Sequence, residues 1–137
     1  MTRVVVDTGP LVALLNRRDR HHGWVREVLD TVEPPIFTCE AVVSEACFLL
    51  GRLASGQDAL LALLANQVVR IDFRLHTEID TVRGLMRKFA SVPMSLADAC
   101  LVRMAELDGT AKVWTTDSHF QIYRRHGREP IALVAPF

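Results

Sequence analysis

The fold is decided by the stretch Val4-Val5-Val6-Asp7-Thr8-Gly9-Pro10-Leu11, in which a β-branched run passes directly into a helical pattern. Three consecutive valines favour a short buried strand, and proline is favoured in the first turn of a helix. Asp7 therefore lies where a strand ends and a helix begins. Backbone N–H groups and the helix dipole favour negative charge at such a position, so Asp7 is either a helix cap or a functional acid.

The same alternation continues along the chain. We predict strands at 3–7, 36–38, 68–72, 112–116 and 131–134, and helices at 11–16, 24–32, 40–54, 57–66, 77–89, 95–107 and 118–125, the last with a capping box formed by Ser118 and Gln121. Strands separated by helices imply parallel pairing with right-handed crossovers. The fold class is therefore α/β, with a parallel sheet covered by helices on both faces. Ligands of such sheets bind beyond the carboxyl ends of the strands.

Length and composition indicate one globular domain over residues 1–137, because 50% of the residues are apolar and 23% are charged. The 16 basic and 16 acidic residues balance, which excludes a broad electropositive surface for nucleic acid. The three cysteines lack C-x-x-C spacing, and we interpret them as small core residues. With no signal-peptide pattern and no apolar run of the roughly 18 residues that a membrane span needs, we expect a cytoplasmic protein.

Two acids end predicted strands and precede predicted helices. Asp7 follows the three valines, and Asp117 follows Val113-Trp114-Thr115-Thr116. Either acid alone is explained equally well as a helix cap. Asp72 also ends a strand, but we assign it to a turn or cap, because strand-end position alone is not sufficient evidence for a functional role.

Two further acids lie within predicted helices. The neighbours of Glu45 at three and four positions are all apolar, which predicts that Glu45 lies inside a buried stripe: Ala41, Val42, Phe48 and Leu49. A carboxylate buried there is costly unless it is paired, hydrogen-bonded or bound to metal. The alternative is a helix rotated so that Glu45 lies at the edge of the stripe. Asp98 follows Ser95 by three positions, so a capping box explains it, although its apolar neighbours favour a further role.

Carboxylates from distant segments suit metal-dependent phosphodiester hydrolysis. Two divalent ions about 4 Å apart stabilise both the attacking and the leaving oxygen, and Mg²⁺ or Mn²⁺ prefers oxygen ligands. Other chemistries lack their motifs, since the sequence contains no H-E-x-x-H, no phosphate-binding glycine loop and no G-x-S-x-G. Three basic clusters, at 17–22, 83–88 and 124–128, are candidates for phosphate contact, but an ordinary charged surface explains each of them better.

Four segments in order resemble the PIN-domain ribonucleases, and especially the VapC-type toxins of bacterial toxin–antitoxin pairs. They are the opening stretch with Asp7, Val43-Ser44-Glu45, Pro93-Met94-Ser95-Leu96-Ala97-Asp98-Ala99 and Thr115-Thr116-Asp117-Ser118-His119-Phe120. Each segment is short, but four at these separations span nearly the whole chain.

The resemblance implies a three-layer α/β/α domain whose sheet gathers Asp7, Glu45, Asp98 and Asp117 around Mg²⁺ or Mn²⁺, with RNA as substrate. It implies that Asp7, Asp98 and Asp117 bind metal, that Glu45 completes the cluster or orients a bound water, and that the Thr115 hydroxyl supports Asp117. It further implies a homodimer and, for a toxin, an antitoxin that blocks the acidic site.

Three alternatives stay open at this point. The chain could be a stand-alone RNA-processing nuclease of the same fold, or a non-catalytic module that binds a basic partner in the acidic pocket. A phosphatase with Asp7 as nucleophile is disfavoured, because residue 9 is glycine and not the second acid of a D-x-D pair.

Overall fold

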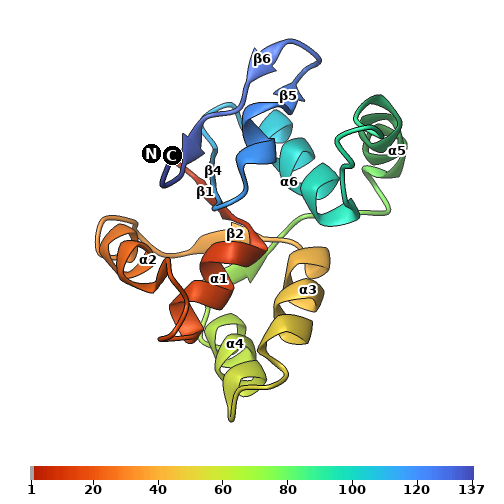
Figure 1. The fold of residues 1–137 in the computed structure, drawn as a ribbon. Coiled ribbons are helices and arrows are strands. Elements are labelled where there is room, and N and C mark those ends of the chain that lie inside the picture. The colour runs from red at the N-terminus through yellow and green to blue at the C-terminus, as the bar shows by residue number, and fades with distance from the viewer. Residues whose placement is uncertain (1) are drawn as a thin grey trace.

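The computed structural model describes residues 2–137, which form a five-stranded parallel sheet in the order β3-β2-β1-β4-β7 with helices packed against it (Figure 1). The strands of this sheet are β1 (Val4–Val6), β2 (Ile36–Thr38), β3 (Val69–Ile71), β4 (Lys112–Trp114) and β7 (Leu133–Val134). The helices are α1 (Thr8–Leu15), α2 (His22–Leu29), α3 (Glu40–Leu50), α4 (Gly56–Ala65), α5 (Ile79–Lys88) and α6 (Leu96–Leu107). The predicted α/β class and parallel sheet are confirmed.

Strands are added to the sheet first on one side of β1 and then on the other. It runs outward from β1 through β2 to β3, and then returns to place β4 on the free side of β1. Right-handed crossovers put α1 to α4 on one face of the sheet and α5 with α6 on the other, which gives three layers. The adjacent strands β1 and β4 therefore form the switch point of the sheet, and open α/β sheets bind ligands beyond the carboxyl ends of the strands at such a point.

The core forms where the valine strands meet the apolar faces of the helices. Val5 and Val6 are fully buried in β1, and Trp114 of β4 is almost fully buried beside them. Leu101 and Val102 supply the apolar side of α6, which packs on β1 and β4. All three cysteines are unbridged; Cys39 and Cys100 are buried, as expected of small core residues, whereas Cys47 is only half-buried.

The C-terminal segment differs from the prediction. The helix predicted at 118–125 is a short 3₁₀ turn, η1 (Ser118–Gln121), and the chain then forms a hairpin of β5 (Arg124–Arg125) and β6 (Glu129–Pro130). The capping box predicted for Ser118 is wrong, because the N-cap of η1 is Asp117. Two consecutive residues with positive φ, His126 at 51° and Gly127 at 77°, make the turn that lets Arg124 and Arg125 pair as a strand with β6.

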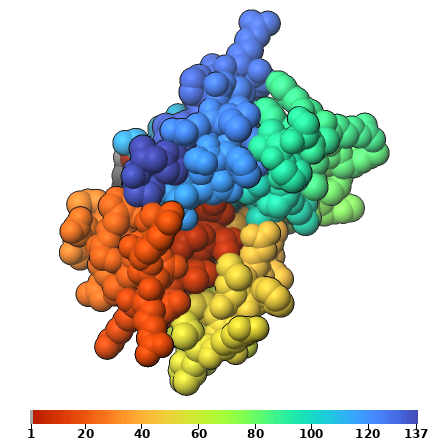
Figure 2. All heavy atoms as spheres, viewed as in Figure 1, coloured from red at the N-terminus to blue at the C-terminus, as the bar shows by residue number. Residues whose placement is uncertain are grey.

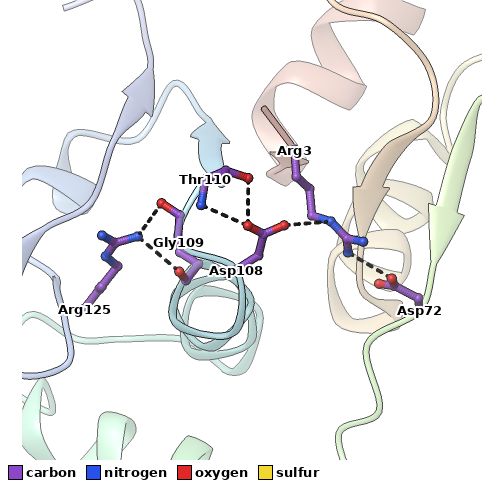
Figure 3. Close-up of polar contacts among 7 residues, drawn as sticks. Arg3, Asp72, Asp108, Gly109, Thr110 and Arg125 are labelled. Atoms are coloured by element: carbon purple, nitrogen blue, oxygen red, sulfur yellow. Dashed lines mark hydrogen bonds and ion pairs between the residues drawn. The ribbon is translucent and has the colours of Figure 1, made fainter. Parts of the chain in front are cut away.

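Arg3 directly precedes β1, at the opposite end of that strand from Asp7, and it joins the strand to the segments that follow β3 and α6 (Figure 3). Its guanidinium lies 2.9 Å from Asp72 and 3.3 Å from Asp108, and it stacks 3.8 Å above the Phe37 ring. Asp72 therefore has a structural partner. The cavities beside Arg3 include none of the four candidate acids. Among residues 2–137, no helix has the length and apolar character needed to cross a membrane.

Candidate active site

The site is built around Asp7, which follows β1 and caps α1. Its Oδ1 accepts a 2.7 Å hydrogen bond from the backbone N–H of Thr8, and its Oδ2 accepts one of 2.7 Å from the hydroxyl of Thr115. Gly9 lets the end of β4 approach, because a Cβ at this position would collide with the Thr116 side chain. The cap role and the site role of Asp7 are thus compatible, since the carboxylate keeps further lone pairs.

Asp117 follows β4 across the switch point from Asp7. Its backbone N–H donates a 2.9 Å hydrogen bond to Oγ1 of Thr115, and its Oδ1 accepts one of 2.9 Å from the N–H of His119. The ring nitrogen Nδ1 of His119 lies 3.3 Å from the same oxygen. Thr115, predicted to support Asp117, therefore bridges the Asp117 backbone and the Asp7 carboxylate.

Asp98 lies in the first turn of α6, where it forms the capping box that the sequence suggested. The Ser95 hydroxyl accepts a hydrogen bond from the Asp98 N–H, and Oδ2 of Asp98 accepts one from the Ser95 N–H. The side chain is nevertheless buried, at 9% exposure. Its Oδ2 also accepts a 2.9 Å hydrogen bond from the hydroxyl of Tyr123.

The prediction that Glu45 is buried is wrong. Glu45 is exposed on α3, and two of the apolar neighbours that suggested a buried stripe, Phe48 and Leu49, are themselves 83% and 56% exposed. Glu45 is still connected to the site, because its Oε2 accepts a 3.0 Å hydrogen bond from the hydroxyl of Thr8, the residue whose N–H holds Asp7. Glu45 therefore lies at the solvent-exposed edge of the site, as in the rotated-helix alternative.

The electrostatics identify three acids as neighbours. Burial raises the pKa of Asp7 to about 6, the bonds from Thr115 and Thr8 oppose this rise, and the charges of Asp98 and Asp117 add to it. The pKa of Tyr123 is raised by burial, by Asp98, and by the charges of Asp117 and Asp7. Asp7, Asp98 and Asp117 therefore share one region of negative potential, and we call these three residues the acid cluster.

The acid cluster has the donor chemistry of an open magnesium or manganese site. All of its donors are carboxylate oxygens, and a cation would offset the burial and the added repulsion that raise the pKa of Asp7. Within residues 2–137, no three His, Cys, Asp or Glu side chains are grouped closely enough to hold a metal ion by themselves. This is compatible with Mg²⁺, which keeps several waters and takes only one or two carboxylates together with substrate phosphate.

Part of α1, the helix that Asp7 caps, is accessible from the surface, although Asp7 itself is only 7% exposed. Figure 2 shows part of α1 (red) at the bottom of a recess between the orange and yellow N-terminal half and the green and blue C-terminal half. In the ribbon view, the beginnings of α3 and α6 lie close to the beginning of α1, in agreement with the packing of α3 against both helices (Figure 1).

The basic cluster at 124–128 is largely engaged in holding the hairpin. Arg124 donates to the carbonyls of Gln121, Ile122 and Tyr123. Arg125 binds Glu129 and the carbonyls of Ala105 and Gly109, two of these contacts being visible in Figure 3. Contacts within the protein therefore account for Arg124 and Arg125. Arg83 and Arg87 on α5 are exposed.

Two site residues were not predicted from the sequence. Thr8, which links Asp7 to Glu45, could have been proposed from its place beside Asp7. Tyr123 gives no signal in the sequence, because nothing around it distinguishes it from an ordinary partly buried aromatic residue. Its contact with Asp98, 25 positions earlier, depends on the tertiary fold.

Comparison with solved structures matches the chain to the crystal structure of Mycobacterium tuberculosis VapC20, described as a sarcin–ricin loop cleaving toxin, with a TM-score of 0.73 and 22% identity over 83% of this chain and 89% of that one. At this identity the likeness concerns the fold. Curated protein sequences give no significant match. Comparison with protein families matches residues 4–125 to the PIN domain. This match covers most of the chain and includes Asp7, Glu45, Asp98 and Asp117, and the chain therefore belongs to the PIN-domain family.

Proposed function

We propose that this protein is a metal-dependent endoribonuclease in which Asp7, Asp98 and Asp117 hold Mg²⁺ or Mn²⁺. The observation that supports the proposal most strongly is the geometry at Thr115, whose hydroxyl donates to Oδ2 of Asp7 and accepts from the N–H of Asp117, so that the acids after β1 and β4 lie close together. Asp98 is near enough that its charge, like that of Asp117, adds to the rise in the pKa of Asp7 that burial causes. Acids that repel one another at the ligand-binding edge of a parallel sheet are costly unless a cation binds there. When bound, the cation would supply charge neutralisation for the phosphodiester and acidify a water molecule.

The remaining residues of the site have positioning roles in this proposal. Thr115 holds the Asp7 carboxylate and the backbone of Asp117 at a fixed separation. Glu45 lies at the solvent-exposed rim, where it could orient a water through the same network that links it to Thr8. The acid cluster repels RNA in the absence of a cation, so cation binding is also part of substrate binding.

The biological role we propose is that of a type II toxin, acting in the cytoplasm as a homodimer and inhibited by a cognate antitoxin. VapC20, a sarcin–ricin loop cleaving toxin, shares the fold over most of both chains. The exposed Phe48 and Leu49 on α3 provide apolar surface for a protein partner. Phe48 lies three positions after Glu45, on the same side of the helix, so a partner that covers it would border the site.

RNA cleavage tests the proposal. The wild-type protein should cleave RNA with Mg²⁺ or Mn²⁺ and lose this activity in a chelator, and Asp7→Asn should be inactive. Arg3→Ala is the matched control, because Arg3 lies away from the acid cluster, and it should retain activity. Equal cleavage by wild type and Asp7→Asn would contradict the mechanism. A protein that binds no Mn²⁺ but captures a basic peptide in the recess would support the non-catalytic alternative.

A further inference from the structure

Tyr123 is a buried tyrosine whose hydroxyl reaches a member of the acid cluster. Its side chain is fully buried, and its hydroxyl donates a 2.9 Å hydrogen bond to Oδ2 of Asp98. A buried phenolic hydroxyl requires a partner, because its desolvation is otherwise uncompensated. The partner here is an ionisable carboxylate, and bonds to such groups are stronger than those between neutral groups.

The position of the Tyr123 ring is fixed by two other aromatic residues. Phe89, directly after α5, and Phe120, within η1, both contact it edge-to-face, with ring centroids 5.3 Å and 5.1 Å away. Both phenylalanines are buried. The phenolic oxygen is therefore held in place independently of its bond to Asp98.

The hydrogen bonds of Asp98 are unevenly divided between its two oxygens. Oδ2 accepts from the Tyr123 hydroxyl at 2.9 Å and from the Ser95 N–H at 3.1 Å. Oδ1 accepts no hydrogen bond from the residues that the structure describes, 2–137. Two donors on one oxygen fix the rotation of the carboxylate, and the other oxygen is left for an external ligand.

Tyr123 also joins the segments that carry two of the acids. Its backbone N–H donates to the carbonyl of His119, and the N–H of Phe120 donates to that of Asp117. The η1 turn thus connects Asp117 at its beginning to Tyr123 just beyond its end. The side chain of Tyr123 then ties this turn to Asp98 at the beginning of α6.

From this geometry we infer that Tyr123 is a positioning residue of the site, which holds Asp98 so that Oδ1 faces the cation or its substrate. The inference rests on the proposed function, because it assumes that Asp98 is a ligand. A hydrogen-bonded partner that orients a ligand typically contributes 10–100-fold to metal affinity. Tyr123 does not itself contact the cation in this scheme.

The test is calorimetric titration of Mn²⁺ into the wild type, Tyr123→Phe and Asp98→Asn, well below their unfolding temperatures. Tyr123→Phe keeps the ring and removes only the hydroxyl, and we expect it to weaken Mn²⁺ binding about tenfold. Thr110→Val is the matched control, because it removes a hydroxyl that donates to a different aspartate, Asp108, outside the site. It should bind Mn²⁺ like the wild type. In the Asp98→Asn background, Tyr123→Phe should have no further effect.

The outcomes separate the inference from the proposed function. If Asp98→Asn weakens binding and Tyr123→Phe does not, the positioning role is wrong and the proposed metal site stands. If the wild type binds no Mn²⁺, both are wrong. Should Tyr123→Phe fail to fold, the hydroxyl proton resonance of Tyr123 in the wild type provides a second test, because it should shift on titration with Mg²⁺. An unchanged resonance in a protein that binds Mg²⁺ would overturn the inference.

Discussion

The hydroxyl of Thr115 donates a 2.7 Å hydrogen bond to Oδ2 of Asp7, although the two residues are 108 positions apart. The register of the sheet explains this contact. Val6 of β1 is paired with Trp114 of β4, so the next residue of each strand lies beside the other at the carboxyl edge. The Asp7 N–H continues the pairing by donating to the Trp114 carbonyl at 2.9 Å. The central pair of the site is therefore a direct continuation of β-pairing.

Replacement of Thr115 by valine tests the structural importance of that hydroxyl. Thr115→Val leaves buried Asp7 with one donor fewer and the Asp117 N–H without its acceptor. We expect a loss of about 1–3 kcal/mol in the free energy of unfolding, measured by urea denaturation, together with weaker RNA cleavage. Thr115→Ser keeps the hydroxyl and should retain most of both. Equal stability of the valine variant and the wild type would show that the bond is not important for folding.

The raised pKa of Asp7 predicts a pH dependence of stability in the metal-free protein. Because its folded pKa of about 6 lies above the usual 3.8, ionisation of Asp7 disfavours the folded state. This cost is small below the unfolded pKa and is fully present once the pH rises above the folded one. Asp7→Asn removes the titration.

In a chelator, the stability of Asp7→Asn relative to the wild type should therefore increase with pH, by up to about 3 kcal/mol near pH 8. Unfolding by urea at a series of pH values measures the difference. A difference that stays constant, or decreases with rising pH, would contradict the burial and the repulsion inferred for Asp7. Addition of Mn²⁺ should stabilise the wild type and not the variant.

We predict that exposed Phe48 on α3 takes part in association with another chain. Phe48 is 83% exposed, so Phe48→Asp should leave the unfolding temperature of a single chain unchanged. If the partner that covers this surface is the second copy of the proposed homodimer, the variant should sediment as a monomer where the wild type is a dimer. The exposed Leu107 of α6 offers a matched control, since Leu107→Asp should leave the dimer intact. A dimer that persists in the Phe48 variant would exclude this surface.

Replacement of Arg3 should lower the stability of the protein without changing its binding of metal. Arg3→Ala removes two ion pairs and a stacking contact with Phe37. Because the paired side chains are 32% to 49% exposed, solvent screening limits the expected loss to about 1 kcal/mol in urea unfolding. Mn²⁺ affinity should be unchanged. A weaker Mn²⁺ affinity in Arg3→Ala would contradict the separation of Arg3 from the acid cluster.

Much of the fold was predictable because its signals are local. Valine strands, apolar helical faces and the alternation of the two predict a parallel sheet with helices on both faces, and this is what the structure contains. The hairpin after η1 was not predicted, because it depends on two positive-φ residues, only one of which is glycine. Its position also depends on contacts far along the chain, such as that of the His126 N–H with Glu106.

The acids were easier to identify than their environments. Asp7 and Asp117 were recognised as strand-end residues, and the sheet order does bring β1 and β4 together. The burial predicted for Glu45 is wrong, because apolar neighbours such as Phe48 face solvent and not the core. Hydrogen bonds such as that between Tyr123 and Asp98 join residues by tertiary packing, for which the sequence carries no periodic signal.

The central claim is that Asp7, Asp98 and Asp117 share a cation, and anomalous diffraction from crystals soaked in Mn²⁺ tests it most directly. The account predicts an anomalous peak within coordination distance of at least one oxygen of this cluster, with Oδ1 of Asp98 facing the ion directly or through water. The peak should be lost in crystals of Asp7→Asn. A Mn²⁺ peak remote from the cluster, or an unoccupied cluster at saturating Mn²⁺, would contradict the account.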